Sequence, residues 1–389
     1  MYHIQTLNKI SPIGLNRMNP AEYSVSNDEA APDAILVRSA KLLDMEFPGS
    51  LLAISRAGVG VNNIPVDRAS EKGIAVFFTP GANANAVKEL VLCAMLIGSR
   101  DIPGALTWVR EQARLGEVAD VVEKGKSAFV GPELYKKTLG IIGLGAIGSK
   151  VANMAVDLGM EVYGYDPYLS VETALRLDHH VHVVQDVTDL YKRADYITIH
   201  VAYMPATEHM IDQEAISKMK RGVRFINIAR GELVDDAAMT AALETGMVAT
   251  YVTDFPNNRI LAAPHVVAMP HLGASTPESE QNCAVLAVDE VKDYLETGNV
   301  RNSVNLPNVS MDPSGVQRLC LIHKNVPGML GNITSLFGRD GVNVENLSNK
   351  SKGDYAYTIA DLGAKVDAQA LEDVRNLNGI LKVRVIDWQ

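Results

Sequence analysis

Residues 138–270 alternate short apolar stretches with helical stretches, and this alternation restricts the fold more than any other feature of the sequence. Strands that alternate with helices of this length form βαβ units around a parallel sheet. We expect strands at 138–145, 161–166, 196–201, 223–229, 248–254 and 266–269. Helices are expected near 146–158, 187–194, 213–219, 235–245 and 277–297.

The first hundred residues show a similar alternation, with strands expected at 34–38, 52–56 and 74–78 and an amphipathic helix at 83–99. A chain of 389 residues is too long for one ordinary core, so we expect more than one domain. The predicted fold class is α/β, with two doubly wound domains, one flavodoxin-like and one Rossmann. The first would comprise residues 1–95 and 277–306, and the second residues 96–276.

A turn-rich stretch at 299–315 ends the alternation, and we interpret residues 307–315 as a linker. Residues 316–389 then predict strand, helix, strand, strand, helix and strand in turn. This βαββαβ order is the ferredoxin-like pattern.

The composition is that of a globular chain, with 47% hydrophobic and 21% charged residues. The net charge of −10 without a basic block argues against nucleic acid or an anionic membrane as the main partner. Cys93, Cys283 and Cys320 lie far apart without metal-ligand spacing, so we expect free, buried thiols, no metal and a reducing compartment. No signal-like segment or long apolar stretch is present, and we expect a cytoplasmic protein.

A G-x-G-x-x-G motif at 143–148 follows an apolar strand and precedes a helix. Its glycines allow a tight turn close to a pyrophosphate, which would bind the N–H groups that open the helix. Asp166 ends the next strand, where it would accept hydrogen bonds from the ribose and repel a 2′-phosphate. The motif therefore predicts NAD rather than NADP; the alternative is a structural turn beside a solvated Asp.

Arg230 and His271 each follow an apolar strand, at the edge where open α/β sheets bind ligands. Oxidation of a 2-hydroxy acid needs a cation for the carboxylate and a base for the hydroxyl proton. An Arg can bind a carboxylate through two hydrogen bonds, although a surface ion pair is the ordinary role of such a residue. His265, at the other end of its strand, is interpreted as a solvated loop residue.

Three segments resemble the D-2-hydroxyacid dehydrogenase family, and within it the phosphoglycerate dehydrogenases. Residues 227–235 are similar to its N-x-A-R-G-x-x-V-D segment, residues 270–276 to P-H-L-G-A-S-T, and residues 56–63 to R-A-G-x-G-V-D-N. The resemblance implies NAD-dependent oxidation of 3-phospho-D-glycerate to 3-phosphohydroxypyruvate, the first step of L-serine biosynthesis. It also implies a substrate-binding first domain and an NAD-binding second domain.

The resemblance assigns roles to individual residues. Arg230 would bind the carboxylate, and His271 would exchange the proton. The substrate would contact the backbone of Val59 and Gly60 and the side chains of Arg38, Arg56, Asn83 and Lys126, the last one across a dimer. The cofactor would lie against Gly143, Gly145, Ala146, Ile147, Gly148, Asp166, His200, Val201, Ala202, Ala229 and Asp254.

One position departs from the family pattern. The family places a Glu 29 residues after the Arg to support the His, and here that residue is Arg259. Either Glu278 or Glu280 supports His271, or the His works without a carboxylate. We hypothesise the second, which predicts an acidic limb of the rate profile at lower pH than in a His–Glu enzyme.

Residues 316–386 resemble an ACT regulatory domain. The resemblance implies an edge-to-edge pairing of such domains in a homodimer or homotetramer, with L-serine as an allosteric effector. The effector would contact His323, Asn325, Gly328 and Asn343; a purely structural dimerisation module is the alternative.

Two other functions remain open from the sequence. The chain could oxidise another 2-hydroxy acid, such as glycerate or lactate. It could also be a non-catalytic NAD-sensing protein of the same fold, a reading that the missing Glu favours and that Arg230 and His271 oppose.

Overall fold

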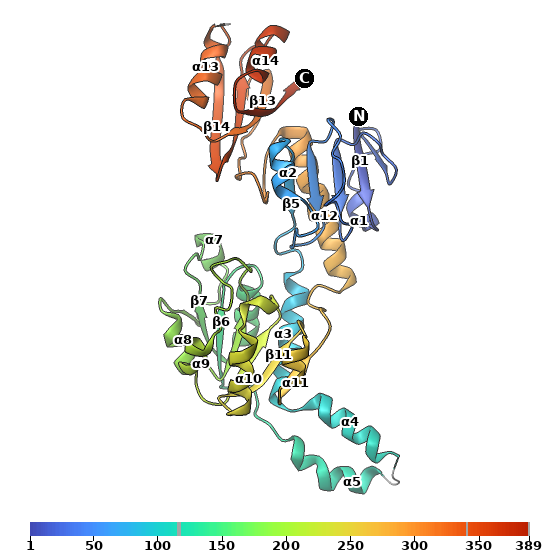
Figure 1. Ribbon diagram of the computed structural model, residues 1–389, viewed down its shortest axis with the longest axis vertical. Helices are drawn as coiled ribbons and strands as arrows, with labels where there is room; N and C mark the ends of the chain where they lie inside the picture. Colours follow the sequence, from blue (N-terminus) through green and yellow to red (C-terminus); the bar gives the residue numbers. More distant parts are fainter. Residues whose placement is uncertain (115–117, 340, 388–389) are drawn as a thin grey trace. The chain divides into compact units, whose positions relative to one another are not determined.

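The computed structural model describes residues 1–114, 118–339 and 341–387, and the chain divides into two compact units (Figure 1). The first unit comprises Met1–Ala82 and Glu280–Gln389, and the second comprises Asn83–Ser279. The last two residues of the predicted C-terminal module, 388–389, lie outside the described residues.

The N-terminal part of the first unit is a five-stranded parallel sheet in the order β2-β1-β3-β4-β5, which is the flavodoxin-like order. Both faces of the sheet are covered, because alternate residues of the same strand enter different cores: Ile35 packs in one and Leu36 in the other. The strands are β1 (Tyr2–Leu7), β2 (Tyr23–Ser26), β3 (Ala34–Val37), β4 (Ala53–Arg56) and β5 (Ala75–Phe78). The helices are α1 (Pro12–Leu15), α2 (Val66–Glu71) and α12 (Pro277–Thr297).

The second unit contains a seven-stranded parallel sheet in the order β12-β11-β10-β9-β6-β7-β8. The order reverses between β6 and β9, as in a Rossmann fold, and this point is where such sheets bind ligands. The strands are β6 (Thr138–Ile142), β7 (Glu161–Tyr165), β8 (Val181–Val183), β9 (Tyr196–Ile199), β10 (Val223–Asn227), β11 (Val248–Thr253) and β12 (Val266–Ala268). The helices are α3 (Ala84–Ser99), α6 (Gly148–Asp157), α7 (Val171–Ala174), α8 (Val187–Arg193), α9 (Gln213–Ser217), α10 (Asp236–Glu244) and α11 (Asn258–Ala262), with a short 3-10 helix η2 (Gly231–Leu233).

Helix α3 belongs to the second unit from its first residue. Its buried residues Val87, Val91 and Met95 share a core with Leu139 and Ile141 of β6. The division therefore falls at 82/83, whereas the sequence reading placed it at 95/96, inside this helix.

A pair of helices, α4 (Ile102–Gln112) and α5 (Val118–Gly125), projects from the second unit and is followed by the 3-10 helix η1 (Lys126–Phe129) (Figure 1). None of the described residues in these three elements is buried. Among the described residues no single helix is long and apolar enough to cross a membrane; α3 and α4, bent by 61° at their junction, meet the length and composition criterion only as a pair.

The C-terminal part of the first unit is an antiparallel sheet in the order β14-β15-β13-β16 with two helices, in the predicted βαββαβ order. Helices α13 and α14 cover one face through Leu319 and Leu321, and the other face adds Cys320 and Ile322 to the core that contains α12. This second contact explains why the module, predicted as a separate domain, is part of the first unit. The elements are β13 (Gln317–Lys324), α13 (Met329–Arg339), β14 (Val344–Lys352), β15 (Tyr355–Leu362), α14 (Ala368–Arg375) and β16 (Ile380–Asp387).

Polar contacts strengthen the attachment of this sheet to the end of α12. Arg384 donates to the carbonyls of Tyr294 and Leu295 at 3.0 and 2.9 Å. Arg318, itself paired with the buried Asp361 at 2.6 Å, donates to the carbonyl of Thr297 at 2.7 Å. Cations at a helix C-terminus satisfy its free carbonyls and its dipole.

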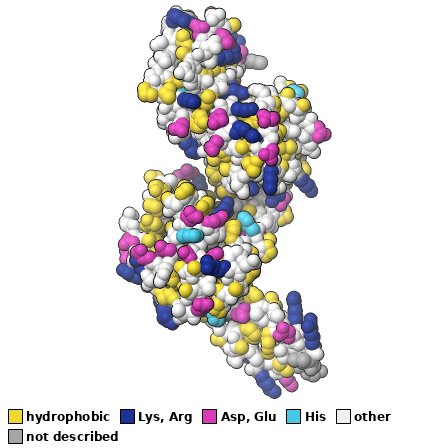
Figure 2. Space-filling view, in the orientation of Figure 1, with side chains coloured by type: hydrophobic (Ala, Val, Ile, Leu, Met, Phe, Trp, Pro, Cys, Tyr) yellow, Lys and Arg dark blue, Asp and Glu magenta, His cyan; other side chains and the backbone are white. Residues whose placement is uncertain are grey.

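The surface carries charges of both signs. Figure 2 shows Lys and Arg side chains interspersed with Asp and Glu side chains, without a continuous basic patch on the visible face. All three cysteines are free, but Cys93 is exposed, which corrects the expectation that all three are buried.

Candidate functional site

The glycine turn after β6 has the geometry that a dinucleotide site requires. Gly143 has a φ of +90°, and a Cβ there would lie 2.6 Å from the carbonyl oxygen of His200 at the end of β9. A Cβ at Gly148 would lie 1.9 Å from the carbonyl oxygen of Gly143. Neither position therefore accepts a side chain, whereas nothing lies within 4 Å of a Cβ at Gly145, so that glycine faces open space.

Donors without partners lie at this turn. The backbone N–H groups of Gly145, Ala146 and Ile147 have no acceptor among the described residues. Free N–H groups before a helix bind phosphate oxygens, so the turn fits the pyrophosphate of a dinucleotide. Asp166 accepts the N–H groups of Leu144 and Tyr168 at 2.9 Å each, and these bonds fix its carboxylate beside the turn.

The segment after β9 adjoins the turn at the point where the strand order reverses. Burial lowers the pKa of the His200 imidazole to about 3, so the ring is neutral. Its Nε2 is hydrogen-bonded to Thr198 Oγ1 at 3.0 Å, and its buried Nδ1 has no partner. Val201 and Ala229 are half-buried and Ala202 is exposed, which leaves them accessible at this edge of the sheet.

Arg230, Asp254 and His271 follow β10, β11 and β12, which are neighbours in the parallel sheet. Their side chains therefore start from one carboxyl edge. The half-buried Arg230 donates to the carbonyl of Ala229 at 2.6 Å, and no counter-ion for it exists among the described residues. A cation without a counter-ion at this edge can receive a carboxylate.

His271 is exposed, and its ring packs on Phe255 with centroids 4.6 Å apart. In the described part of the chain no carboxylate forms a hydrogen bond or ion pair with this ring. Arg259, at the position of the family's Glu, is exposed on α11, and Glu280 is paired with Arg38 at 2.6 Å.

Asp254 is the carboxylate whose charge acts on His271. It is 1% exposed, accepts the N–H of Gly273 at 3.3 Å, and has no partner for its Oδ1. Burial raises the pKa of Asp254, and the charge of His271 opposes this shift. From the sequence we predicted Asp254 only as a residue beside the cofactor. Asp254 follows β11, the strand next to β12, and this position could have predicted its proximity to His271.

Arg38 follows β3 and Arg56 ends the neighbouring strand β4 of the first unit, and Arg56 Nε donates to the carbonyl of Arg38 at 3.2 Å. They line a hollow of about 220 Å³ together with Lys41, which the sequence reading missed. Lys41 follows the same strand end as Arg38, and this common position was the available signal. The other lining residues are Ser39, Leu43, Asn62 and Asn63.

The backbone beside this hollow has free donors. No acceptor exists among the described residues for the N–H groups of Val59 and Gly60. A Cβ at Gly58 would lie 2.3 Å from Arg56 Nη1, so this glycine allows the guanidinium to lie over the loop. The loop fits a carboxylate as the resemblance implies.

Two predicted substrate residues lie in the second unit. Asn83 precedes α3, and its buried Oδ1 has no partner. A Cβ at Gly273 would lie 3.5 Å from both Val87, one turn into α3, and Asp254, so α3 begins close to the His271 segment. Lys126 starts η1 beyond the projecting helices and is paired with Glu123, and within one chain the structure does not bring it to the other predicted site residues of this unit.

Of the predicted effector residues, His323, Asn325 and Gly328 lie at one end of the antiparallel sheet, where Lys324 pairs with Tyr355. Asn343 precedes β14 at the opposite end, where Val344 pairs with Leu362, so the structure does not bring it to the other three within one chain. His323 is 2% exposed; its Nδ1 donates to the carbonyl of Lys324, and its Nε2 is hydrogen-bonded to Thr358 Oγ1, both at 2.9 Å. The exposed Asn325 and Asn343 donate to Gly353 O and Glu345 Oε1. Gly328, with a φ of +80°, forms the turn before α13.

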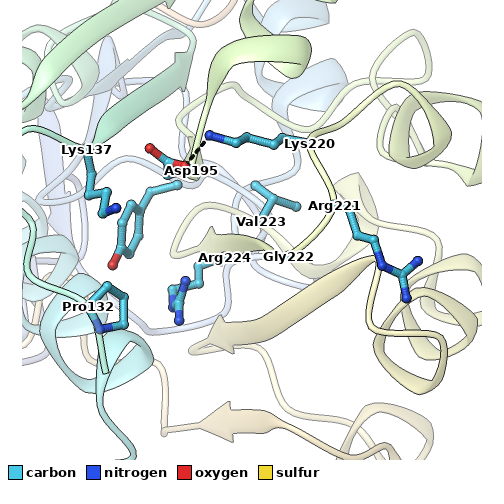
Figure 3. A pocket seen from close by; sticks show the side chains of 9 residues that line it. Pro132, Lys137, Asp195, Lys220, Arg221, Gly222, Val223 and Arg224 are labelled. Carbon is cyan, nitrogen blue, oxygen red and sulfur yellow. Dashed lines mark hydrogen bonds and ion pairs between the residues drawn. The ribbon is translucent and has the colours of Figure 1, made fainter. Parts of the chain in front are cut away.

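Another hollow, of about 70 Å³, lies at the amino ends of β6, β9 and β10, opposite the glycine turn (Figure 3). Three of the four cations that line it are engaged: Lys220 pairs with Asp195 at 2.6 Å, and Arg221 and Arg224 donate to the carbonyls of Thr245 and Gly98. The fourth is Lys137. We assign no role to this hollow.

Comparison with known proteins identifies the family. Residues 92–273 match the model of the D-isomer specific 2-hydroxyacid dehydrogenase, NAD binding domain. The D-3-phosphoglycerate dehydrogenase of Escherichia coli K12 is 32% identical over 349 residues, which cover 86% of this chain and 82% of that enzyme. The chain belongs to the D-isomer specific 2-hydroxyacid dehydrogenase family. It carries the family's NAD-binding domain, whose sequence segment coincides with the second unit apart from its ends.

Other members of the family are longer than this chain. The D-3-phosphoglycerate dehydrogenase of Methanocaldococcus jannaschii is 37% identical over 310 residues, covering 77% of this chain and 56% of that enzyme. The Bacillus subtilis enzyme of the same name is 34% identical, with 91% and 64% covered. The chain thus spans about half to two thirds of the length of these relatives.

Two solved structures share the fold. The NAD⁺-bound 3-phosphoglycerate dehydrogenase of Entamoeba histolytica matches with a TM-score of 0.61 and 24% identity, over 78% of this chain and 98% of that one. The holo form of Rhodotorula graminis D-mandelate dehydrogenase matches with a TM-score of 0.65 and 21% identity, over 80% and 99%.

Proposed function

We propose that the protein is an NAD-dependent dehydrogenase that oxidises 3-phospho-D-glycerate to 3-phosphohydroxypyruvate. The observation that carries the proposal is the hollow lined by Arg38, Lys41 and Arg56, because three cations suit a phosphate with up to two negative charges. Relatives named D-3-phosphoglycerate dehydrogenase support the same substrate.

In this proposal Arg230 binds the substrate carboxylate and polarises the C2 oxygen. The free N–H groups of Val59 and Gly60 are donors that also suit a carboxylate. His271 removes the proton from the C2 hydroxyl as the C2–H bond breaks, and returns it to the carbonyl oxygen in the reverse reaction. Bound NAD supplies the hydride acceptor at the glycine turn. Asp166, held by two backbone N–H groups, favours NAD by repelling a 2′-phosphate.

The test is NADH formation by the purified full chain with 3-phosphoglycerate, glycerate and lactate in parallel, each with NAD and with NADP. We expect activity with phosphoglycerate and NAD well above the other combinations. Activity restricted to the unphosphorylated acids would reject the phosphate assignment. NAD binding without turnover of any of them would favour the non-catalytic alternative.

For the C-terminal module we propose an ACT domain that binds L-serine and pairs with a second copy in a homodimer or homotetramer. Asn325 and the turn at Gly328 offer exposed polar groups at one end of the sheet, and Asn343 offers one at the opposite end. His323 would act by holding Thr358, since both of its ring nitrogens are engaged. Calorimetry should detect serine binding that Asn325→Ala and Asn343→Ala abolish; unchanged affinity in both variants would reject the site.

A further inference from the structure

The three cations of the first unit's hollow differ in their partners. Arg38 Nη1 lies 2.6 Å from Glu280 Oε1. Arg56 donates to the carbonyl of Arg38, whereas Lys41 has no ion-pair partner in the part of the chain that the structure describes. Of the three, Arg38 thus has an internal counter-anion and Lys41 has none among the described residues.

Glu280 reaches Arg38 from the fourth residue of α12, and both residues belong to the first unit. Their side chains are 48% and 36% exposed, so the ion pair is open to solvent. Exposed ion pairs contribute little to stability and are readily exchanged for another partner. Arg38 is therefore paired with Glu280, but another anion can replace this partner.

We propose that Glu280 is an exchangeable counter-anion of Arg38, that a phosphate monoester takes its place when substrate binds, and that Lys41 first receives this phosphate. The inference deepens the proposed function and rests on it for the identity of the substrate. In this proposal Glu280 and Lys41 together determine the selectivity for phosphorylated over unphosphorylated acids.

The selection follows from charge. A phosphate with up to two negative charges is attracted by Arg38, Arg56 and Lys41 together, and its oxygens match the guanidinium fork of an Arg. This attraction exceeds that of the single carboxylate of Glu280, which is released to water. An unphosphorylated acid has no phosphate that could replace Glu280 beside Arg38. The Glu280–Arg38 ion pair therefore stays formed, and such an acid does not bind in the hollow.

The first experiment measures the binding of inorganic phosphate to the full chain by calorimetry, in the absence of NAD and substrate. Glu280→Gln removes the competing charge and should tighten binding about two- to fivefold, in keeping with the modest strength of exposed ion pairs. Glu71→Gln, which removes an exposed charge from the end of α2 in the same unit, should leave the affinity unchanged. Unchanged or weaker binding by Glu280→Gln would overturn the exchange, because a Glu that merely positions Arg38 gives that result.

The second experiment tests the receiving cation. Lys41→Gln should weaken phosphate binding by about three- to tenfold, since it removes a cation that has no competing partner. Lys72→Gln removes a charge that is likewise exposed, lies 3.9 Å from Glu46 and is outside the hollow, and should have no effect. Equal affinities of the Lys41 and Lys72 variants would remove Lys41 from the proposal.

A kinetic readout connects the exchange to the reaction. Glu280→Gln should lower KM for 3-phosphoglycerate by a similar factor without changing kcat, and should not lower KM for glycerate. If none of the acids gives NADH while the calorimetric differences hold, the proposed function fails and the exchange stands. If phosphoglycerate is oxidised but Glu280→Gln binds phosphate like the unmodified chain, the exchange fails and the proposed function stands.

Discussion

The two parallel sheets present different chemistry at the same kind of edge. The carboxyl edge of the first unit carries Arg38, Lys41 and Arg56 around an open hollow. The corresponding edge of the second unit carries one cation, Arg230, with His271 two strands away. The first set suits the binding of a multiply charged anion, and the second suits a proton transfer beside a carboxylate.

Each edge also has a buried carboxyl group beneath it. Glu290 on α12 is 6% exposed and accepts a hydrogen bond from Asn302 at 2.8 Å, and Asp254 after β11 is 1% exposed. Burial raises the pKa of both groups, but only Asp254 has an imidazole to oppose the shift. The parallel topology therefore brings these side chains to the edge of each sheet. The residues that contact each side chain then determine its charge and its chemical role.

The largest expected effect is on the proton-transferring residue. His271→Asn should lower kcat by about 10²–10⁴-fold, the usual contribution of a general base, with little change in NAD affinity. His265→Asn is the matched control, because this exposed residue lies at the other end of β12. Steady-state kinetics and NAD titration measure both variants. A decrease in kcat of less than tenfold in His271→Asn would mean that another group transfers the proton.

Arg230→Lys should keep the positive charge but remove the guanidinium group, which can bind a carboxylate through two hydrogen bonds. We expect kcat/KM to fall roughly 10- to 10³-fold, since a hydrogen bond to a charged group contributes about 1.5–3 kcal/mol. Arg221→Lys, on the opposite edge of the sheet, should change nothing. Equal kinetics for the two variants would show that Arg230 does not bind the substrate.

Much of the architecture was predictable, because buried parallel strands are continuous apolar runs. All four residues of β3 and of β9 are buried, and both strands were expected. Strands β1 and β2 were missed, since Gln5 and Ser26 interrupt their apolar pattern near the sheet edge. The predicted strands of the second unit extended one to three residues too far, into the segments that follow each strand.

The parts of the site that a sequence motif fixes were predictable. Ion pairs between residues from distant segments of the chain were less so. The glycine turn and Asp166 lie together as the spacing required. The pairing of Glu280 with Arg38 was not foreseen, because 242 positions separate the two residues and only the fold of α12 onto the sheet joins them. Lys41 was overlooked for a different reason: a single Lys after a strand resembles any solvated residue.

The buried carboxyl groups give a pH test of the comparison. Burial raises the pKa of Glu290 to about 8, well above its value in an unfolded chain. The folded state therefore holds this proton more tightly, so the contribution to stability is complete below about pH 4.5 and is lost as the pH rises through 8. Glu290→Gln should remove this loss and stabilise the protein at pH 9 by a few kcal/mol in urea unfolding. Asp289→Asn changes the neighbouring residue on α12, which pairs with Arg17 at the surface, and leaves Glu290 in place. This control should therefore lose stability above pH 8 as the unmodified protein does.

The smallest effect concerns the carboxylate behind His271. Asp254 and His271 attract each other when both are charged, so Asp254→Asn should move the acidic limb of the kcat/KM profile to lower pH. Glu278→Gln, an exposed residue without an ion pair in the described chain, should leave the limb in place. The opposite result would mean that α12 supplies the supporting carboxylate from its first turn. No movement in either variant would mean that His271 works alone, and the two sheet edges would then differ in their cations but not in the use of a buried carboxyl.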